Sequence, residues 1–381
     1  MATKPPPLPP EVRALYVDAE GKLSPTAVRA QQEVKPVLKT EAKILLITDW
    51  PSEEASHSGK LFSGSAGVEL RGEMAEAGIA FNDCSCTTVL LNRPSKGDIN
   101  TLCVPLVEAR AAVEAERPWR EIKGKKGVLP PTIVQPALER LYSEIDKVQP
   151  NLVIALGAVA LAALTGDNLI GKSRGTIHLV DIGSRRVKVL PVYHPATTLR
   201  QYEQRPTAVA DFHKARLEAE SPDWNPAVRT FYTEPTVEDL QQVWLPALLK
   251  ARVLAVDIET ARGQITCLSF SPSPWESYIV PFCFQNRSYW ATVEEEVEAY
   301  KFVREVLRAP MPKIFQNGMY DITYMWKYKW PTIDASMDTM LLHHALFPMM
   351  PKALGYIGSV YANERSWKMD RLRGGEEKDA D

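Results

Sequence analysis

Carboxylates gather in two short segments of the carboxy-terminal half of the chain. Asp257 and Glu259 stand two residues apart in the apolar run VDIET, so both side chains leave the same face of a strand. Asn317 and Asp321 stand four apart, one helical turn, and can face the same cleft. Clustered carboxylates suit Mg²⁺ or Mn²⁺, which can activate water for phosphodiester cleavage. Taken singly, each of these residues favours a structural role, with Asp257 at a strand end and Asp321 in a surface turn.

A second set of polar residues follows the apolar runs of the amino-terminal half. Asp49 ends the first run, and small residues at 63–67 open a helix directly after Phe62. His194 follows a later run and is held in a fixed turn by Pro195. In an open α/β sheet, ligands bind beyond the carboxyl ends of the strands, so we expect a pocket here. The alternatives are a hydrogen-bonded turn histidine and a phenylalanine of the core.

The elements that must position these residues alternate along the first half. The apolar runs 44–47, 87–91, 152–156 and 187–192 predict buried strands. Between them, TIVQPALERLYSEIDKVQP carries one apolar face at helical spacing. This alternation predicts an α/β domain whose mostly parallel sheet is covered on both sides.

A proline-containing polar segment at 218–230 separates this pattern from a second one. A helix is expected at 237–250, then a meander formed by RVLAVDIET, QITCLSFSP and SYIVPF, and then the helix TVEEEVEAYKFVREVLRAP. The predicted organisation is therefore a proline-rich tail at 1–32, a first domain at 33–220, a linker at 221–228 and a second domain at 229–381.

Composition excludes several classes of protein. A chain of 381 residues with 45 Lys+Arg and 47 Asp+Glu has a net charge of −2, so nucleic acid must be bound by local basic patches. The 5 cysteines lack a repeated CxxC spacing, which argues against a disulfide framework and favours a reducing, cytoplasmic compartment. No apolar run reaches membrane-spanning length. A basic rim around the first pocket is expected from Arg93, Lys96, Arg174, Arg200 and Arg205.

The carboxylate segments resemble the proofreading 3′-to-5′ exonuclease domain of family-A DNA polymerases, of the DEDD superfamily, over about 229–381. The resemblance implies a ribonuclease H-like (DnaQ-like) fold. Asp257, Glu259 and Asp321 would be catalytic and ligate Mg²⁺ or Mn²⁺, Asn317 would orient the substrate strand, and the segment from Asp338 would help build the site.

The third motif of that family, Tyr-x-x-x-Asp, is missing, because Tyr361 is followed four residues later by Arg365. We therefore expect an incomplete exonuclease fold with impaired hydrolysis. Three explanations remain open: a fragment of a longer polymerase, a helix supplied by another polypeptide, or a domain that has become a binding module.

The first domain resembles the uracil-DNA glycosylase superfamily, especially its family-4 type, over about 43–215. The resemblance rests on TDWPSEE, LFSGSAGVEL, PNLVIALGAVALAAL, the GKSRG turn and the HPA motif that begins at His194. It implies that Phe62 stacks on a flipped base and that His194 stabilises the departing base. Asp49 would activate or position water, and Arg200 would press into the DNA groove.

Departures from that family affect the substrate and the cofactor. Thr88 stands where the family has an asparagine that reads the uracil edge, so the accepted base is open. Asn92 and Val134 occupy two positions of the family's cluster-binding cysteines, so we expect no iron–sulfur cluster.

Together, the two resemblances match the amino-terminal part of certain bacteriophage family-A DNA polymerases. They imply a DNA-replication protein of the host cytoplasm that binds a single strand or primer terminus, with a separate polymerase polypeptide as a second expected partner. The alternatives are a non-catalytic DNA-binding or polymerase-recruiting module and an active base-excising glycosylase.

Overall fold

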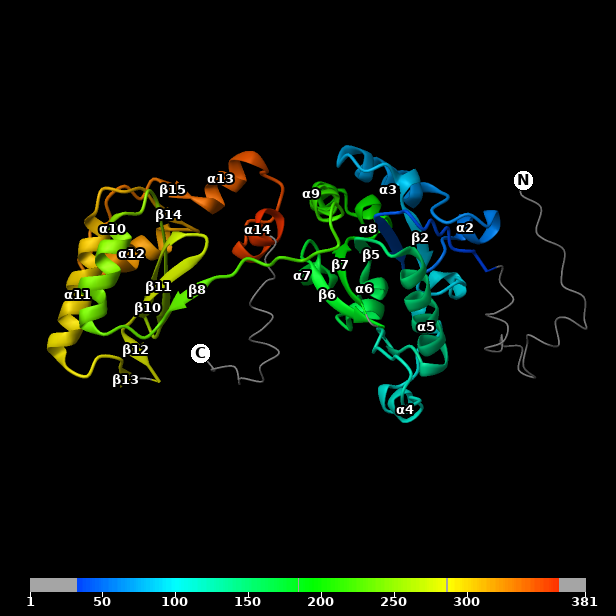
Figure 1. Ribbon diagram of the computed structural model, residues 1–381, viewed down its shortest axis with the longest axis horizontal. Helices are drawn as coiled ribbons and strands as arrows, with labels where there is room; N and C mark the ends of the chain where they lie inside the picture. Colours follow the sequence, from blue (N-terminus) through cyan, green and yellow to red (C-terminus); the bar gives the residue numbers. More distant parts are fainter. Residues whose placement is uncertain (1–32, 184, 286, 363–381) are drawn as a thin grey trace, which may run out of the picture. The chain divides into compact units, whose positions relative to one another are not determined.

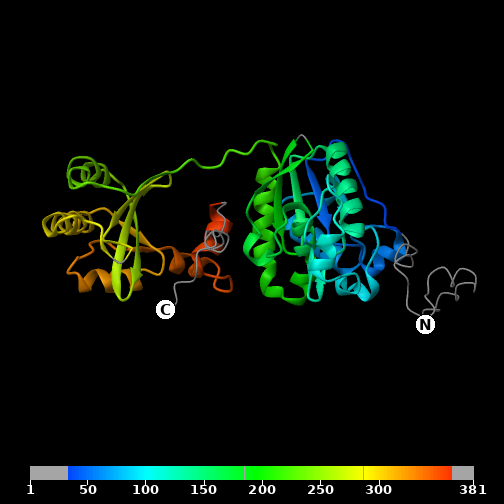
Figure 2. The same ribbon diagram turned by 90° about the horizontal axis from the view of Figure 1, so that it is seen from below.

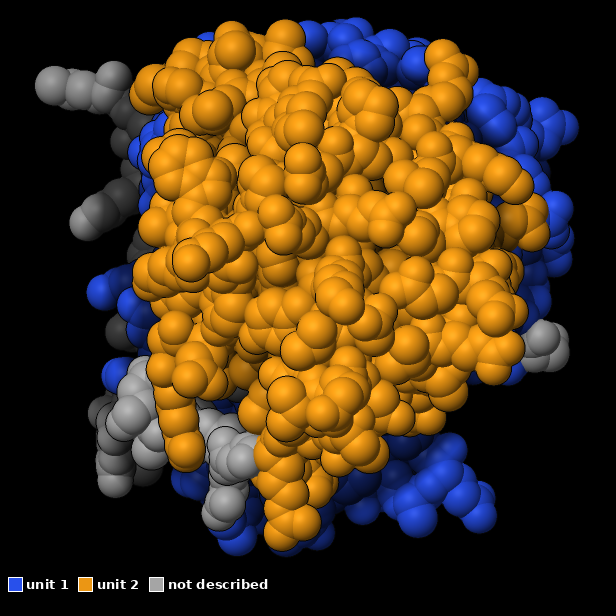
Figure 3. Space-filling view, turned by 90° about the vertical axis from the view of Figure 1, so that its left-hand side faces the viewer, with its two compact units in different colours: residues 1–224, 355–381 blue, residues 225–354 orange. Residues whose placement is uncertain are grey.

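The chain forms two compact units, shown in different colours in Figure 3. The computed structural model describes residues 33–362 apart from 184 and 286, so the expected tail at 1–32 lies outside the described residues. Unit 1 comprises Met1–Trp224 and Gly355–Asp381, and unit 2 comprises Asn225–Leu354. The chain thus leaves unit 1, builds unit 2 and returns to unit 1.

The return differs from the expected second domain at 229–381. Helix α14 (Leu354–Tyr361) lies almost wholly in unit 1. The reason is a set of polar contacts: Arg174 donates to Ser359 Oγ at 3.1 Å, and the Tyr356 hydroxyl lies 2.7 Å from Thr207 Oγ1. The boundary between the units falls between Trp224 and Asn225, inside the expected linker.

Unit 1 is built on a five-stranded sheet with the order β2-β1-β5-β7-β6. Strands β2, β1, β5 and β7 are parallel, and β6 is antiparallel to β7. The expected mostly parallel α/β sheet is therefore confirmed. Its strands are β1 (Ile44–Thr48), β2 (Ser85–Thr88), β5 (Leu152–Leu156), β6 (His178–Ile182) and β7 (Arg185–Val192).

Successive strand residues point to opposite faces of this sheet. Both faces are buried because each carries apolar side chains and is covered by helices. Leu45 and Ile47 pack with helices α5 (Pro131–Val148) and α6 (Ala158–Thr165) in one apolar cluster. Ile44 and Leu46 pack with α3 (Ser65–Glu76) and α9 (Arg205–Glu218) in another. Figures 1 and 2 show these layers. Smaller elements complete the unit: α2 (Glu53–Ser58), β3 (Lys123–Gly124), β4 (Gly127–Val128), α4 (Leu106–Ala111), α7 (Ile170–Ser173) and α8 (Pro195–Arg200).

Unit 2 holds a six-stranded sheet with the order β15-β14-β9-β10-β11-β8. β9, β10 and β11 form an antiparallel meander, and β14 and β15 add in parallel on the other side of β9. This topology confirms the expected ribonuclease H-like class. Its strands are β8 (Thr230–Tyr232), β9 (Leu254–Ala261), β10 (Gln264–Ser273), β11 (Glu276–Pro281), β14 (Lys313–Phe315) and β15 (Met337–Asp338), with a separate hairpin of β12 (Cys283–Phe284) and β13 (Arg287–Ser288).

The core of unit 2 follows from alternation along β9 and from an amphipathic helix. Val256 and Ile258 are buried against Phe302 and its neighbours on α11 (Val293–Arg308), which begins at a capping box formed by Thr292 and Glu295. The other helices are α10 (Leu245–Leu249), α12 (Met319–Lys327) and α13 (Thr339–Leu346). Within the described ranges, no helix has both the length and the apolar character needed to cross a membrane.

Candidate functional sites

The carboxylates of unit 2 lie where the central strand β9 extends past its paired segment with β14, and we call this group of Asp257, Glu259 and Asp321 the carboxylate edge. Asp257 and Glu259 lie on the face of β9 opposite the core residues, as their spacing predicts. Asp321, in the first turn of α12, is 4% exposed, and its Oδ1 accepts the backbone N–H of Ile258 at 3.1 Å. This hydrogen bond ties the start of α12 to the strand that carries the other two carboxylates.

The charges at this edge destabilise one another. Desolvation raises the pKa of Asp257 to about 6, and the charges of Asp321 and Glu259 add to the effect. Desolvation likewise raises the pKa of Asp321, although the Ile258 amide opposes it and the charge of Asp338 adds to it. Mutual repulsion of this kind shows that the three sequence-predicted carboxylates are close enough to interact.

Asp338 is a structural anchor of the same edge. Its carboxylate accepts the backbone N–H of Asn317 at 3.2 Å, of Gly318 at 2.8 Å and of Met340 at 2.9 Å, and so joins the turn before α12 to the start of α13. Gly318 is required because a Cβ there would lie 2.5 Å from the Phe315 side chain. Asn317 has a φ of 60° and is exposed at this turn.

The carboxylates do not converge on a single point. In the described part of the chain, no group of three or more His, Cys, Asp or Glu side chains is arranged to hold a metal ion. One oxygen of Asp321 is engaged by the Ile258 amide, and like charges resist closer approach. The predicted ligands Asp257, Glu259 and Asp321 are thus brought to one edge, and their coordination of a metal stays a prediction. Tyr361 ends α14, in unit 1, and Arg365 lies outside the described residues.

In unit 1, His194 is held at both ring nitrogens. It caps α8, where the Ala196 N–H donates to Nδ1 at 3.1 Å, and its Nε2 lies 3.0 Å from Thr48 Oγ1. Because Nδ1 accepts, the proton of the neutral ring belongs on Nε2, which then donates to Thr48. Burial lowers the pKa of His194 to about 4, with the positive charge of Arg200 as a smaller cause. The ring is therefore neutral at pH 7.

Asp49 lies beside this histidine motif and is bound to a helix. Its Oδ1 accepts the N–H of Ala160 at 3.0 Å in the first turn of α6. Burial raises the pKa of Asp49 to about 7, while the amides of Ala160 and Val159 oppose the shift. Gly157, with a φ of 101°, permits the approach, since a Cβ there would lie 3.0 Å from both carboxylate oxygens. Asp49 thus binds the backbone at the start of α6. Its activation or positioning of water stays a prediction.

Phe62 belongs to the apolar cluster between the sheet and helix α3. The side chain is buried, its ring packs edge-on against Phe81 at 5.7 Å, and its φ of 56° is unusual for a bulky residue. Gly67 is indispensable to this conformation, because a Cβ there would lie 1.6 Å from the Phe62 carbonyl oxygen. The contacts of Phe62 are therefore those of a core residue. Its stacking on a flipped base stays a prediction.

The remaining predicted contacts of unit 1 fall into different environments. The buried Thr88 hydroxyl donates to the Leu90 carbonyl at 2.8 Å, while Arg200 is exposed at the end of α8. The basic-rim prediction is wrong for Arg174, which is 2% exposed and forms an ion pair with Asp211. A buried guanidinium needs such a partner, which a net-charge argument from sequence does not reveal.

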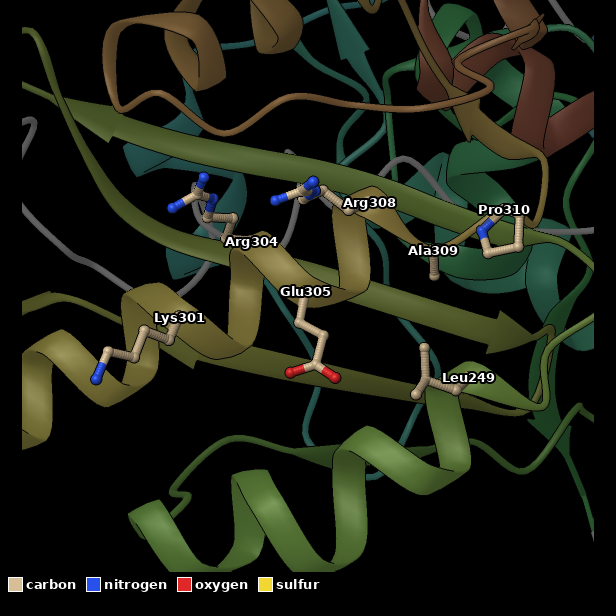
Figure 4. A pocket seen from close by; sticks show the side chains of 7 residues that line it. All are labelled: Leu249, Lys301, Arg304, Glu305, Arg308, Ala309 and Pro310. Atoms are coloured by element: carbon tan, nitrogen blue, oxygen red, sulfur yellow. The ribbon is translucent and has the colours of Figure 1, made fainter.

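Sequence reasoning missed two features. Thr48, the partner of His194, could have been noticed as the last residue of a strand whose carboxyl end was expected to bind ligand. The second feature is a groove of about 560 Å³ between α10 and α11, shown in Figure 4. Its signal was the spacing of three basic residues by three and four along α11. The groove is lined by Leu249, Lys301, Arg304, Glu305, Arg308, Ala309 and Pro310.

The amino-terminal site lies in a part of the chain that matches a known superfamily. Residues 36–217 match the sequence model of the uracil DNA glycosylase superfamily. The type-4 uracil-DNA glycosylase of Archaeoglobus fulgidus is 23% identical over 179 residues, which cover 46% of this chain and 75% of that protein. The type-4 enzyme of Thermotoga maritima is 25% identical over 179 residues, with coverages of 46% and 77%.

A longer match includes both units. A DNA polymerase of Bacillus phage SP01 is 24% identical over 361 residues, 86% of this chain and 34% of the polymerase, so this chain spans about a third of that relative. The resemblance to a phage DNA polymerase is thereby confirmed.

Solved structures add weaker likenesses. The EXD2 exonuclease domain soaked in Mn and GMP aligns with 40% of this chain and 76% of its own, at a TM-score of 0.24 and 13% identity. NrnC of Brucella melitensis aligns with 36% and 62%, at 0.25 and 14%.

Proposed function

We propose that this chain processes DNA in association with a polymerase and that unit 2 cleaves phosphodiester bonds from the 3′ end with a divalent cation. The match of 86% of the chain to a phage DNA polymerase supports the proposed association with a polymerase. The observation that carries the activity is the gathering of Asp257, Glu259 and Asp321 at one edge, where desolvation and neighbouring carboxylates raise the pKa values of Asp257 and Asp321.

The donor chemistry of this edge fits Mg²⁺ or Mn²⁺. Three carboxylates offer hard oxygen ligands, and opposite charge would offset the desolvation and the repulsion that raise the pKa of Asp257. Asp257, Glu259 and Asp321 would hold the ion, which when bound supplies an acidified water and charge neutralisation. Ile258 orients Asp321, Asp338 fixes the turn that presents Asn317, and the exposed Asn317 would contact the substrate strand.

A nuclease assay on 3′-labelled single-stranded DNA with Mn²⁺ tests this proposal. We expect the Asp257→Ala variant to lose at least about 100-fold in rate, because a ligand and a neighbouring charge are removed together. Glu294→Ala, an exposed carboxylate on α11 of the same unit, is the matched control and should retain full activity. Equal rates for wild type and Asp257→Ala would reject the proposal.

A second candidate function is base excision by unit 1. It is favoured by the neutral His194 ring, whose Nε2–H is a donor that a base oxygen could take over from Thr48. The test is the appearance of alkali-labile sites in duplexes that carry uracil or other modified bases. His194→Ala should abolish them and His213→Ala, an exposed histidine on α9, should not. No cleavage across the panel of bases would reject this candidate.

The third reading is a module that binds DNA without turnover. The groove between α10 and α11 offers Arg304 and Arg308 as exposed cations for phosphates, although Glu305 opposes an anion there. Salt-sensitive DNA binding, with no cleavage or base release under any condition above, would favour this reading.

A further inference from the structure

Three glutamates share one face of helix α3. Glu69, Glu73 and Glu76 are spaced by four and three residues, so they follow one another along the helix surface. Arg205, the first residue of α9, donates to Glu69 at 2.8 Å and to Glu76 at 2.7 Å. The nearby guanidinium therefore binds the outer two carboxylates.

The middle glutamate is buried without a partner. Glu73 is 0% exposed, and neither of its carboxylate oxygens has a hydrogen-bond partner among the described residues. An ionised carboxylate in that position would lose its hydration with nothing in return, which is among the costliest states for a side chain. A neutral carboxylic acid in the same place needs only one acceptor for its proton.

The acceptor is available on helix α8, which packs against α3. Thr198 of α8 is also fully buried, and its hydroxyl lies close enough to Glu73 to affect the pKa of that carboxyl group. The Thr198 hydroxyl already donates its own hydrogen to the Pro195 carbonyl at 2.9 Å, so toward Glu73 it can act only as an acceptor. Pro195 directly follows His194, the residue that caps α8.

We propose that Glu73 holds a proton in the folded protein and donates it to Thr198, so that a relay from α3 through Thr198 to the Pro195 carbonyl positions His194. Glu73 is in this sense a positioning residue, because it acts through α8 and touches no substrate. The functional side of the proposal rests on the proposed base-recognising role of His194, whereas the proton on Glu73 does not.

The electrostatics of the surroundings agree with a neutral acid. Burial raises the pKa of Glu73 to about 7, the charges of Glu69 and Glu76 raise it further, and the charge of Arg205 opposes the shift. A Thr198 hydroxyl that donated to Glu73 would also lower this pKa, but its hydrogen is engaged by the Pro195 carbonyl. Arg200, the one charged residue of α8, is exposed. Since the folded-state pKa lies above the ordinary value of 4.5, the stabilisation is complete below pH 4.5 and is lost as the pH rises to about 7.

The proton is detected directly by infrared difference spectroscopy of the full chain. Wild type minus Glu73→Gln should show a protonated carboxyl band at pH 5 that disappears through a titration centred near pH 7. The isosteric glutamine stays neutral at every pH and keeps a donor for Thr198. A difference spectrum in which Glu73 is ionised at pH 5 would overturn the proposal.

Hydrogen exchange of the α8 amides tests the positioning. Relative to Glu73→Gln, exchange in wild type should accelerate by up to about tenfold per pH unit between pH 5 and 7, after correction for intrinsic rates. Thr198→Val, which removes the relay, should accelerate α8 exchange at pH 5. Identical pH profiles for wild type and Glu73→Gln would contradict the relay. Absence of base release by all variants, alongside the expected carboxyl band, would reject only the proposed function of unit 1.

Discussion

The two candidate sites differ in how their polar side chains are paired. In unit 1, His194 is neutral and donates to Thr48, Asp49 binds the start of α6, and Thr88 donates to a nearby carbonyl. In unit 2, Asp257, Glu259 and Asp321 share an edge, where desolvation and neighbouring carboxylates raise the pKa values of Asp257 and Asp321 although the Ile258 amide donates to Asp321. The first site is internally paired, whereas the second holds uncompensated negative charge.

This difference separates the ligands that each unit can accept. A site whose hydrogen bonds are already made exchanges one neutral partner for another, and its specificity is set by shape and donor position. A site with clustered carboxylates gains most from a cation, because the ion removes a repulsion that the fold itself sustains. Perturbations of backbone geometry should therefore affect unit 1 most, and divalent ions should affect unit 2 most.

The largest expected effect is Gly67→Ala in unit 1. The added Cβ would lie 1.6 Å from the Phe62 carbonyl oxygen, which is a rigid backbone atom, so we expect destabilisation of about 3 kcal/mol or more. Gly72→Ala on the same helix is the control, since its Cβ would lie 3.8 Å from the nearest atom, on the Arg205 side chain. Denaturant unfolding followed by hydrogen exchange in α3 and β1 measures both. Equal stability of the two variants would show that the Phe62 turn is not rigid.

The next effect is the pH dependence contributed by His194. Its folded-state pKa of about 4 lies below the ordinary 6.5, so folding favours the neutral ring. That stabilisation is present above pH 6.5 and is lost as the pH falls toward 4, a change of about 3 kcal/mol. Asp49 contributes with the opposite sign, since its pKa is raised to about 7.

The comparison of wild type with His194→Gln isolates the histidine, because both proteins retain Asp49. Unfolding of unit 1 should show wild type losing stability relative to the variant between pH 6.5 and pH 4. His213→Gln, exposed on α9, should follow wild type. Parallel curves for wild type and His194→Gln would mean that the ring is not held neutral, and the contrast between the two sites would fail.

Divalent ions should stabilise unit 2 alone. Free Mn²⁺ at about 100 times its dissociation constant should raise stability by about 2.7 kcal/mol, through binding to the folded state only. Hydrogen exchange should slow in β9 and α12 but not in β1 and α8. The effect should vanish in Asp257→Ala and persist in Glu294→Ala. Protection of both units to the same degree would point to non-specific binding.

Sequence periodicity was a sufficient guide to the sheets and a partial guide to the sites. The alternation of Val256 and Ile258 with Asp257 and Glu259 fixes which face of β9 is buried, so the carboxylate edge could be foreseen. The spacing of Asn317 and Asp321 did not reveal that Asp338, about twenty residues away, holds their turn through backbone amides. Tertiary hydrogen bonds of this kind have no local pattern.

The same limit explains the errors in unit 1. From the sequence alone, Arg174 is expected to be an exposed cation. The fold instead pairs it with Asp211 and places Ser359 of α14 against its guanidinium group. The return of α14 to unit 1 could not be predicted either. The apolar residues of a helix indicate that it packs against another part of the protein, but they do not indicate which unit that is.

The smallest effect expected is also the most direct test of the pairing in unit 1. Thr48→Val keeps the shape of the side chain and removes the acceptor of the His194 Nε2–H, leaving a partly buried donor unsatisfied. We expect a loss of about 1 kcal/mol in stability, against no change for Thr132→Val, which is exposed on α5. If a base oxygen replaces Thr48 as the acceptor, the variant should bind base-containing DNA more tightly than wild type, since no internal hydrogen bond then has to be broken. Weaker binding would instead assign the Thr48 hydroxyl itself to the substrate.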